Sequence, residues 1–195
     1  MGVVIEDVQP AEEFALEQPA SGAEESLAPL EAAFREHYPR IVGMLSRLTG
    51  DRVRAEDIAS GVFCKLAHRP AILRSRGDPA AWMYRVAVNA GLDALRVATR
   101  RRRNEAAAGV ETLRKAAPAS ALNDLLRAER QARVRETLAA LKSRDAQLLL
   151  LHAGGLSYRE VAATLGVAVG SVGTLLARAE AEFERKFRSR YGGEL

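Results

Sequence analysis

Residues 156–172 read LSYREVAATLGVAVGSV, and this stretch predicts a helix-turn-helix. Ser157 precedes Glu160 by three residues, the spacing of a capping box in which each residue satisfies a free backbone N–H at the start of a helix. Gly166 follows where the helix should end, because glycine adopts the left-handed conformation of a helix C-terminus without strain. A second amphipathic run begins near Gly170 and carries apolar side chains inward: Val172, Leu175, Leu176, Ala179 and Phe183. Many proteins place a recognition helix in the DNA major groove in this way, although any two short helices of an α-helical bundle share the pattern.

The composition excludes several classes of protein. The single cysteine, Cys64, rules out an internal disulfide framework, and His37, His68 and His152 are too scattered to form a metal site. The helical pattern around Cys64 predicts a small buried or half-buried side chain rather than a nucleophile. The sequence has no run of about 18 apolar residues and no basic N-terminal signal segment. We therefore expect a cytoplasmic protein with no membrane span, metal or cofactor.

Charge is distributed unevenly along the chain, whose formal net charge is +4. Residues 1–30 contain seven acidic residues and no basic one, whereas residues 31–195 contain all 29 lysines and arginines against 18 acidic residues. An acidic tail on a basic body indicates a polyanion-binding core behind a disordered leader, which we place at residues 1–27. The leader is either a solubilising tail or a shield that covers the basic surface until DNA displaces it.

The apolar pattern of the rest of the chain predicts helices and no strands. Apolar residues recur every three or four positions in several runs separated by glycine, proline or aspartate. An alanine-rich stretch with little periodicity divides these runs into two groups and predicts a flexible linker. We therefore expect an all-α fold with two small helical domains, residues 28–103 and 122–188, with the linker at 104–121 and a tail at 189–195.

Local signals predict the ends of several helices. The first helix begins at Leu27 and contains Pro39, where proline predicts a kink or a break. Asp51 is expected to cap the second helix, since aspartate accepts hydrogen bonds from free N–H groups at a helix start. Ser143 is expected to cap a short apolar helix at 147–153 in the same way.

A polar stripe follows the predicted third helix, which Asp78 caps and which runs to about Arg100. Six polar residues recur at intervals of three or four and therefore share one helix face: Arg85, Asn89, Asp93, Arg96, Arg100 and Arg103. The stripe ends in four consecutive arginines at 100–103, and the loop at 71–77 before the helix adds Arg74 and Arg76. This concentration of cations indicates contact with nucleic-acid phosphates.

Several short motifs run in order through both predicted domains. The first domain contains FREHYPR at 34–40, GD at 50–51, AEDI at 55–58, AWMYRVAVN at 81–89 and DALR at 93–96. The second contains GLSY at 155–158 and GSV at 170–172, within residues 138–178. In order and spacing these motifs resemble the second and fourth regions of the extracytoplasmic-function group of bacterial sigma factors, the promoter-recognition subunits of RNA polymerase. The resemblance covers residues 28–103 and 122–188.

The resemblance implies a non-enzymatic protein whose partners are core RNA polymerase and promoter DNA. The polymerase-facing patch of such a protein falls on the second helix: Glu56, Asp57, Ile58 and Phe63. The residues that would contact the melted strand and the phosphates near the −10 element are Arg74, Arg76, Asn89, Arg96, Arg100 and Arg101. The residues that would contact the −35 element lie in the helix-turn-helix: Ser157, Tyr158, Arg159, Ser171, Thr174 and Arg178. An anti-sigma factor that clamps the two domains is common in such systems and is a further candidate partner.

Three residues of the polar stripe leave two interpretations open. Asn89, Asp93 and Arg96 either meet the melted strand, whose unpaired bases need a pocket and nearby cations, or form a hydrogen-bonded network that rigidifies the helix.

The sequence departs from the resemblance in the recognition helix. Basic residues are usual where this chain has Gly173, Leu175 and Glu180. Ala168 stands at the expected N-cap, where a side chain unable to cap costs about 1 kcal/mol. In the polymerase-facing helix, Gly61 costs about 1 kcal/mol relative to alanine. We therefore expect weaker or unusual reading of the −35 element, and either weaker polymerase binding or a surface specialised for another partner.

Two other classes of protein compete with this interpretation. A helix-turn-helix regulator that binds duplex DNA without core polymerase would need a dimerisation element and a sensor, and neither the linker nor the first domain supplies an obvious one. An all-α enzyme would need catalytic groups that converge on one point. Glu56 and Asp57 are adjacent on a helix and so face different directions.

Overall fold

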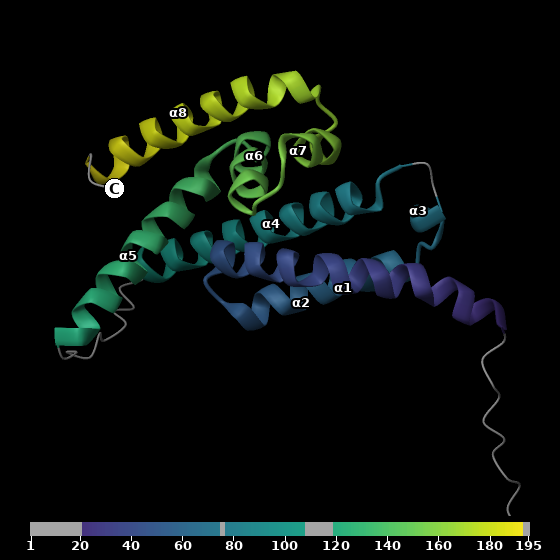
Figure 1. Ribbon diagram of the computed structural model, residues 1–195. Coiled ribbons are helices and arrows are strands. Elements are labelled where there is room, and N and C mark those ends of the chain that lie inside the picture. The colour runs from purple at the N-terminus through teal and green to yellow at the C-terminus, as the bar shows by residue number, and fades with distance from the viewer. Residues whose placement is uncertain (1–20, 75–76, 108–118, 193–195) are drawn as a thin grey trace, which may run out of the picture.

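The computed structural model describes residues 21–74, 77–107 and 119–192, and within these ranges the chain is helical with no strand. The helices are α1 (Ser21–Thr49), α2 (Arg52–Ala67), α3 (Ala71–Arg74), α4 (Pro79–Ala107), α5 (Ala119–Ala140), α6 (Ser143–Ala153), α7 (Tyr158–Leu165) and α8 (Val172–Tyr191), with a 3-10 turn, η1 (Val169–Ser171), before α8. The expected all-α fold is confirmed. Figure 1 shows α1, α2 and α4 packed side by side, with α6 and α7 on the other side of α4 and α8 beyond them.

In the first lobe, α1 to α4, helix α1 packs against both α2 and α4. Ile41, Leu45 and Leu48 of α1 are fully buried or nearly so, because they recur on the face that meets α2 and α4. Gly91 of α4 lies directly opposite this row. A Cβ atom at Gly91 would lie 2.6 Å from Leu45 Cδ2 and 2.8 Å from Leu48 Cδ2. The absence of a side chain therefore sets how closely these two helices approach.

The second lobe, α5 to α8, has its core on the apolar faces of its three C-terminal helices. Leu148 and Leu151 of α6, Val161 of α7 and Val172 of α8 are fully buried. The inward direction predicted for the apolar residues of α8 is confirmed, since Val172, Leu176 and Ala179 are buried and Leu175 and Phe183 pack against the core.

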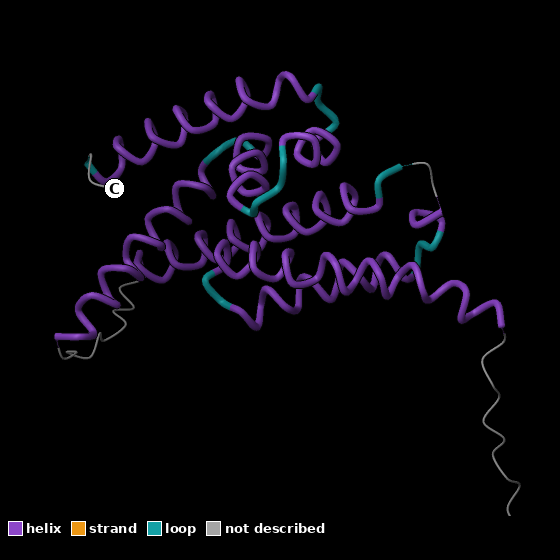
Figure 2. Tube along the Cα trace, in the orientation of Figure 1, coloured by secondary structure: helices purple, strands orange, loops and turns teal. Residues whose placement is uncertain are grey.

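The two lobes are not separate bodies. Helix α4 packs against α5, α6 and α7, and α1 also touches α6. The buried side chains of both lobes form one continuous hydrophobic cluster. In Figure 2 the loop that joins α6 to α7 lies over the helices of the first lobe. The sequence predicted two domains but carried no signal for this contact.

Two of the predicted caps are confirmed. Asp51 accepts a hydrogen bond from the backbone N–H of Arg54 at 3.2 Å at the start of α2. Asp78 accepts one from the backbone N–H of Ala80 at 2.9 Å at the start of α4. Ser143 does not cap its helix, because α6 begins at Ser143 itself and Lys142 occupies the cap position without a side-chain hydrogen bond. The Ser143 hydroxyl instead accepts a hydrogen bond from Arg96 of the first lobe at 3.0 Å.

Several helix ends also differ from the sequence predictions. Helix α1 begins at Ser21 rather than Leu27, and residues 1–20 of the predicted leader lie outside the described residues. A kink or a break was expected at Pro39, and of these the break does not occur: α1 runs through Pro39, with Tyr38 and Ile41 packed into the lobe on either side of it.

The predicted third helix and linker are corrected as well. Helix α4 continues past Arg100 to Ala107, where Arg101 pairs with Glu105 one turn later at 2.7 Å. Helix α5 begins at Ala119, so residues 108–118 of the predicted linker are the part outside the described residues. Part of the predicted loop at 71–77 is the short helix α3. Cys64, predicted to be buried or half-buried, is exposed.

Candidate nucleic-acid interface

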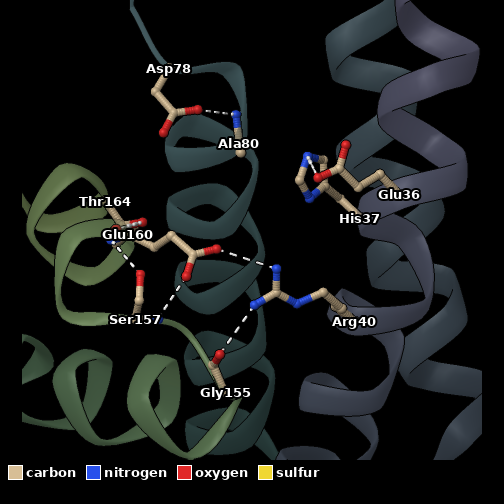
Figure 3. A network of polar contacts seen from close by, with 9 residues as sticks. All are labelled: Glu36, His37, Arg40, Asp78, Ala80, Gly155, Ser157, Glu160 and Thr164. Atoms are coloured by element: carbon tan, nitrogen blue, oxygen red, sulfur yellow. Dashed lines mark hydrogen bonds and ion pairs between the residues drawn. The ribbon is translucent and has the colours of Figure 1, made fainter.

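The predicted capping box forms at the start of α7. The Ser157 hydroxyl accepts a hydrogen bond from the backbone N–H of Glu160 at 3.3 Å. The Glu160 carboxylate accepts one from the backbone N–H of Ser157 at 2.7 Å. Figure 3 shows that this carboxylate also faces Arg40 of α1, whose guanidinium lies 3.3 Å away. One side chain therefore both starts the helix-turn-helix and contacts the first lobe.

The turn after α7 has the geometry expected of a helix-turn-helix. Gly166 adopts φ 66° and ψ 43°, the left-handed conformation that the sequence predicted, and so ends α7. Ala168 precedes η1 without a side-chain cap, as the sequence also predicted. The axes of α7 and the following helix differ by 106°, within the range typical of this motif.

The outer face of this motif is open. All six residues predicted to contact the −35 element have exposed side chains: Ser157, Tyr158, Arg159, Ser171, Thr174 and Arg178. The Tyr158 ring lies against His152, with 5.8 Å between ring centroids, and near the Cα of Gly173. A Cβ atom at position 173 would lie 3.6 Å from Tyr158 Cε2, an ordinary van der Waals contact, so the ring packs over the start of α8 without requiring glycine there.

Hydrogen bonding from Ser157, and to a smaller extent the charge of Arg40, lowers the pKa of the Glu160 carboxyl below its ordinary value of 4.5. A group whose folded pKa is lowered stabilises the fold above its unfolded pKa, and this contribution is lost as pH falls through the folded pKa. We expect Glu160→Gln to be destabilising near neutral pH and to lose this effect as pH falls below 4.5 and through the lowered pKa of Glu160. Chemical denaturation of both proteins across this pH range measures the difference.

Glu180→Gln is the matched control for this measurement. Glu180 is exposed on α8 and has no ion-pair or hydrogen-bond partner among the described residues. Its substitution should give a difference from the parent protein that stays near zero at every pH. A Glu160→Gln difference that persists unchanged at the lowest pH would contradict the assignment.

The predicted polymerase-facing residues of α2 have mixed exposure. Asp57 is exposed, and Glu56 is partly exposed and forms an ion pair with Arg52 at 2.8 Å. Ile58 is half-buried and Phe63 is buried, so both mainly hold α2 to the first lobe. Phe63 meets Phe34 of α1 edge-on, with 5.0 Å between ring centroids.

The residues predicted to meet the −10 element fall into two separate groups. Asn89 and Arg96 lie on the part of α4 that faces the second lobe, where they contact Gln147 and Ser143. Arg100 and Arg101 lie beyond this contact and are exposed. The side chain of Arg74 and the whole of Arg76 lie outside the described residues. Arg96 also pairs with Asp93 on its own helix at 3.6 Å, whereas Asn89 bonds to Gln147 of the other lobe, and both interpretations of the stripe stay predictions.

Sequence reasoning missed the residues that join the lobes. Arg40 donates to the backbone carbonyl of Gly155 at 3.2 Å as well as pairing with Glu160. Arg85, predicted only as part of the stripe, donates to the backbone carbonyls of Thr164 and Ala163. No local pattern could reveal these contacts, because the partners are 78 residues or more away along the chain.

Comparison with known protein families matches both lobes. The sigma-70 region 2 family matches residues 33–101, and the sigma-70 region 4 family matches residues 131–183. The RNA polymerase sigma-H factor of Pseudomonas aeruginosa is 31% identical over 160 residues, which cover 77% of this chain and 81% of that protein. The chain belongs to the extracytoplasmic-function sigma factors. This sigma factor is also similar to the RNA polymerase sigma factor YlaC of Bacillus subtilis, at 27% identity over 157 residues, or 80% of this chain and 90% of that one.

A solved structure is also similar to this sigma factor. A chain of the co-crystal structure of the sigma factor RpoE with the anti-sigma factor NepR from Bartonella quintana matches at 15% identity and a TM-score of 0.42. The match covers 86% of this chain and 96% of that one. Sigma factors are in general not enzymes, and the described residues contain no group of three His, Cys, Asp or Glu that could hold a metal ion. No single described helix is long and apolar enough to cross a membrane, and only α7 taken together with the bent helix after it reaches that length and composition.

Proposed function

We propose that this sigma factor binds core RNA polymerase and directs it to promoters, with no catalytic activity of its own. The family supplies the general role, and the open outer face of the helix-turn-helix is the observation that supports the DNA contact. On this proposal the start of α8 enters the major groove at the −35 element, and the exposed face of α2 around Asp57 meets polymerase. The residues at 28–103 would serve the −10 element and those at 122–188 the −35 element. Such a protein would work in the cytoplasm, where the chromosome and polymerase are found.

On this proposal, only a few side chains read the bases of the −35 element. Thr174 and Arg178 are the exposed polar residues of α8 nearest its start, and of these two only Arg178 is positively charged. Ser171 and the free N–H groups at the start of α8 suit contacts with phosphates. Most of the affinity for the promoter would then come from the arginines of the first lobe and from polymerase.

A regulator that binds duplex DNA without polymerase is less well supported. Such a regulator would need only the helix-turn-helix of region 4. Region 2 of the sigma-70 family also matches this chain, over residues 33–101. In vitro transcription with core polymerase on a library of randomised promoters separates the two. Transcription that depends on this protein and selects a two-part promoter supports the proposal, and binding to duplex DNA without any transcription would refute it.

Arg178→Ala is expected to weaken recognition of the selected −35 element by about tenfold, at the low end of the value for a cation that contacts a base edge. The −10 element should be read as before. Competition between promoters that differ only in the −35 element measures this loss.

Arg188→Ala is the matched control, because Arg188 is exposed at the far end of α8 and pairs with Glu184. It should leave selection at the −35 element unchanged. Equal selection by the Arg178→Ala protein and the parent would show that Arg178 has no part in reading that element.

A further inference from the structure

A hollow of about 590 Å³ lies where the last turns of α4 and α8 come to α5 (Figure 1). Its walls are Arg102 of α4, Tyr191 of α8 and one face of α5 between residues 128 and 136. Ala128 and Ala132 lie one turn apart on this face of α5, and their small side chains leave the space open. Pockets that bind small molecules in proteins have volumes of about 300–1,000 Å³, so the hollow is of the size that such a compound needs.

Arg135 of α5 is a half-buried cation in this hollow, and no carboxylate pairs with it among the described residues. Its guanidinium lies against Gly50, in the turn between α1 and α2. A Cβ atom at Gly50 would lie 2.9 Å from Arg135 Nη1 and 3.0 Å from Arg135 Cζ, so the missing side chain makes room for the guanidinium. Backbone packing therefore positions Arg135 without a counterion. Partial burial of an unpaired cation costs free energy that a bound anion would offset.

Arg102 of α4 adds a second cation to the same hollow. It is exposed, and it too has no ion-pair partner within residues 21–74, 77–107 and 119–192. The two arginines are close enough to affect each other, since burial, and then the charge of Arg102, lowers the pKa of Arg135 below its ordinary value. Two guanidinium groups that line one hollow with no carboxylate paired to either of them favour an anion between them.

The two carboxylates that line the hollow are already paired with other groups. Glu129 pairs with Arg133 at 2.7 Å. Glu136 pairs with Arg190 at 2.9 Å and accepts a hydrogen bond from the Tyr191 hydroxyl at 2.8 Å. Both of these arginines also lie 5.5 Å from the centre of the Tyr191 ring, which fixes this wall of the hollow. Neither carboxylate is left unpaired to repel an anion, so the hollow keeps the positive charge of its two unpaired arginines.

We propose that this hollow binds a small phosphorylated compound, whose phosphate group lies between Arg102 and Arg135. The planar guanidinium presents its N–H donors in a fork that matches two oxygens of one phosphate, and the two arginines together balance the charge of a phosphate dianion. The space over Ala128 and Ala132 takes the rest of the compound. Because Arg135 is half-buried against Gly50, the site suits a compact anion better than the backbone of duplex DNA. This binding site is additional to the proposed promoter recognition and does not depend on it.

Isothermal titration calorimetry of the full-length protein with inorganic pyrophosphate tests the site, with chloride added to keep the ionic strength constant. We expect a single pyrophosphate to bind each protein molecule. Pyrophosphate should also raise the Tm, since an anion that binds only the folded chain stabilises it.

Two variants and a matched control locate the bound anion. Arg135→Gln and Arg102→Gln should each weaken pyrophosphate binding by about tenfold or more, because each removes charged hydrogen bonds to the phosphate. Arg144→Gln is the control, since Arg144 is exposed on α6, does not line the hollow and has no partner among the described residues. It removes the same charge and should change the affinity by less than about twofold.

Thermal unfolding separates anion binding from a purely structural role of Arg135. Without pyrophosphate, the Arg135→Gln protein should have a Tm at least as high as that of the parent, because the substitution removes a partly buried, unpaired charge. Its Tm should then rise much less than that of the parent when pyrophosphate is added. A structural role predicts the reverse, a lower Tm with the full rise on adding pyrophosphate. If Arg135→Gln fails to fold, Arg102→Gln decides by the same two measurements, because Arg102 is exposed and its removal leaves the core intact.

The inference is overturned if the parent does not bind pyrophosphate, or if Arg144→Gln weakens the binding as much as Arg102→Gln and Arg135→Gln do. Fluorescence anisotropy with a short DNA duplex of random sequence distinguishes the other source of phosphate. If Arg135→Gln weakens duplex binding as much as it weakens pyrophosphate binding, the hollow belongs to the DNA backbone and the inference is also overturned. None of these measurements involves a promoter or polymerase. Loss of promoter-directed transcription, with the pyrophosphate results as expected, would refute the proposed function and leave this site standing.

Discussion

Leu151→Ala is expected to lower the free energy of unfolding by about 2–5 kcal/mol, the range for removing a fully buried leucine from a packed core. Leu151 is completely buried in α6, and α6 contacts α1 and α4 of the first lobe as well as α7 and α8. The cavity left by the side chain would therefore lie near the centre of the molecule, where neighbouring helices cannot all move in to fill it. Urea denaturation followed by circular dichroism measures the loss.

Leu126→Ala is the control for this substitution. Leu126 has the same side chain on α5 but is 46% exposed, so its removal should change the free energy of unfolding by less than about 0.5 kcal/mol. Equal losses from the two substitutions would show that α6 is not packed as the structure has it. Because the two lobes share one core, the Leu151→Ala protein should still unfold in a single transition in both far-ultraviolet and tryptophan signals.

Gly91→Ala is expected to destabilise the protein by about 1–3 kcal/mol, although alanine favours a helix more than glycine does. The added methyl group would lie 2.6 Å from Leu45 Cδ2 and 2.8 Å from Leu48 Cδ2. Both leucines are buried in the core, so neither can rotate away without disturbing its own neighbours. Helices α1 and α4 would have to separate.

Gly61→Ala should have the opposite effect. Gly61 is exposed in the middle of α2, and no atom lies within 4 Å of the position a Cβ atom would take. The substitution should stabilise the protein by about 0.5–1 kcal/mol through helix propensity alone. Thermal unfolding of the two variants beside the parent decides the matter, and a stabilising Gly91→Ala would mean that the close approach of α1 and α4 is wrong.

The helix-turn-helix could be read from the sequence because its signals are local. The capping box at Ser157 and Glu160, the left-handed Gly166 and the uncapped Ala168 each involve residues within a few positions of one another. The hydrogen bonds of the capping box and of the turn at Gly166 form whenever the chain enters and leaves a helix at those points. The exposed positions of Thr174 and Arg178 follow from the same periodicity that buries Val172 and Leu176.

The errors arose where packing outweighs local preference. Proline at position 39 removes one backbone hydrogen bond, but the half-buried Tyr38 before it and the buried Ile41 after it pack into the lobe, and α1 is continuous. Serine is a common helix cap, yet Ser143 bonds to Arg96 of the other lobe and leaves the cap position to Lys142. In both places a contact with a distant residue replaces the local interaction on which the prediction depended.

The sequence by itself determined the all-α class, the helix-turn-helix, the polar stripe and the membership of a sigma-factor family, because helix periodicity, caps and ordered motifs are properties of neighbouring residues. Only the tertiary structure decided what the stripe faces. Arg85 and Arg96 have the spacing of a DNA-binding surface, but Arg85 bonds to carbonyl oxygens of α7, and Arg96 bonds to a hydroxyl of α6 as well as pairing with Asp93 on its own helix. A guanidinium binds any well-placed acceptor oxygen, whether from phosphate or from a helix end, and the choice between them depends on which lobe or strand lies opposite.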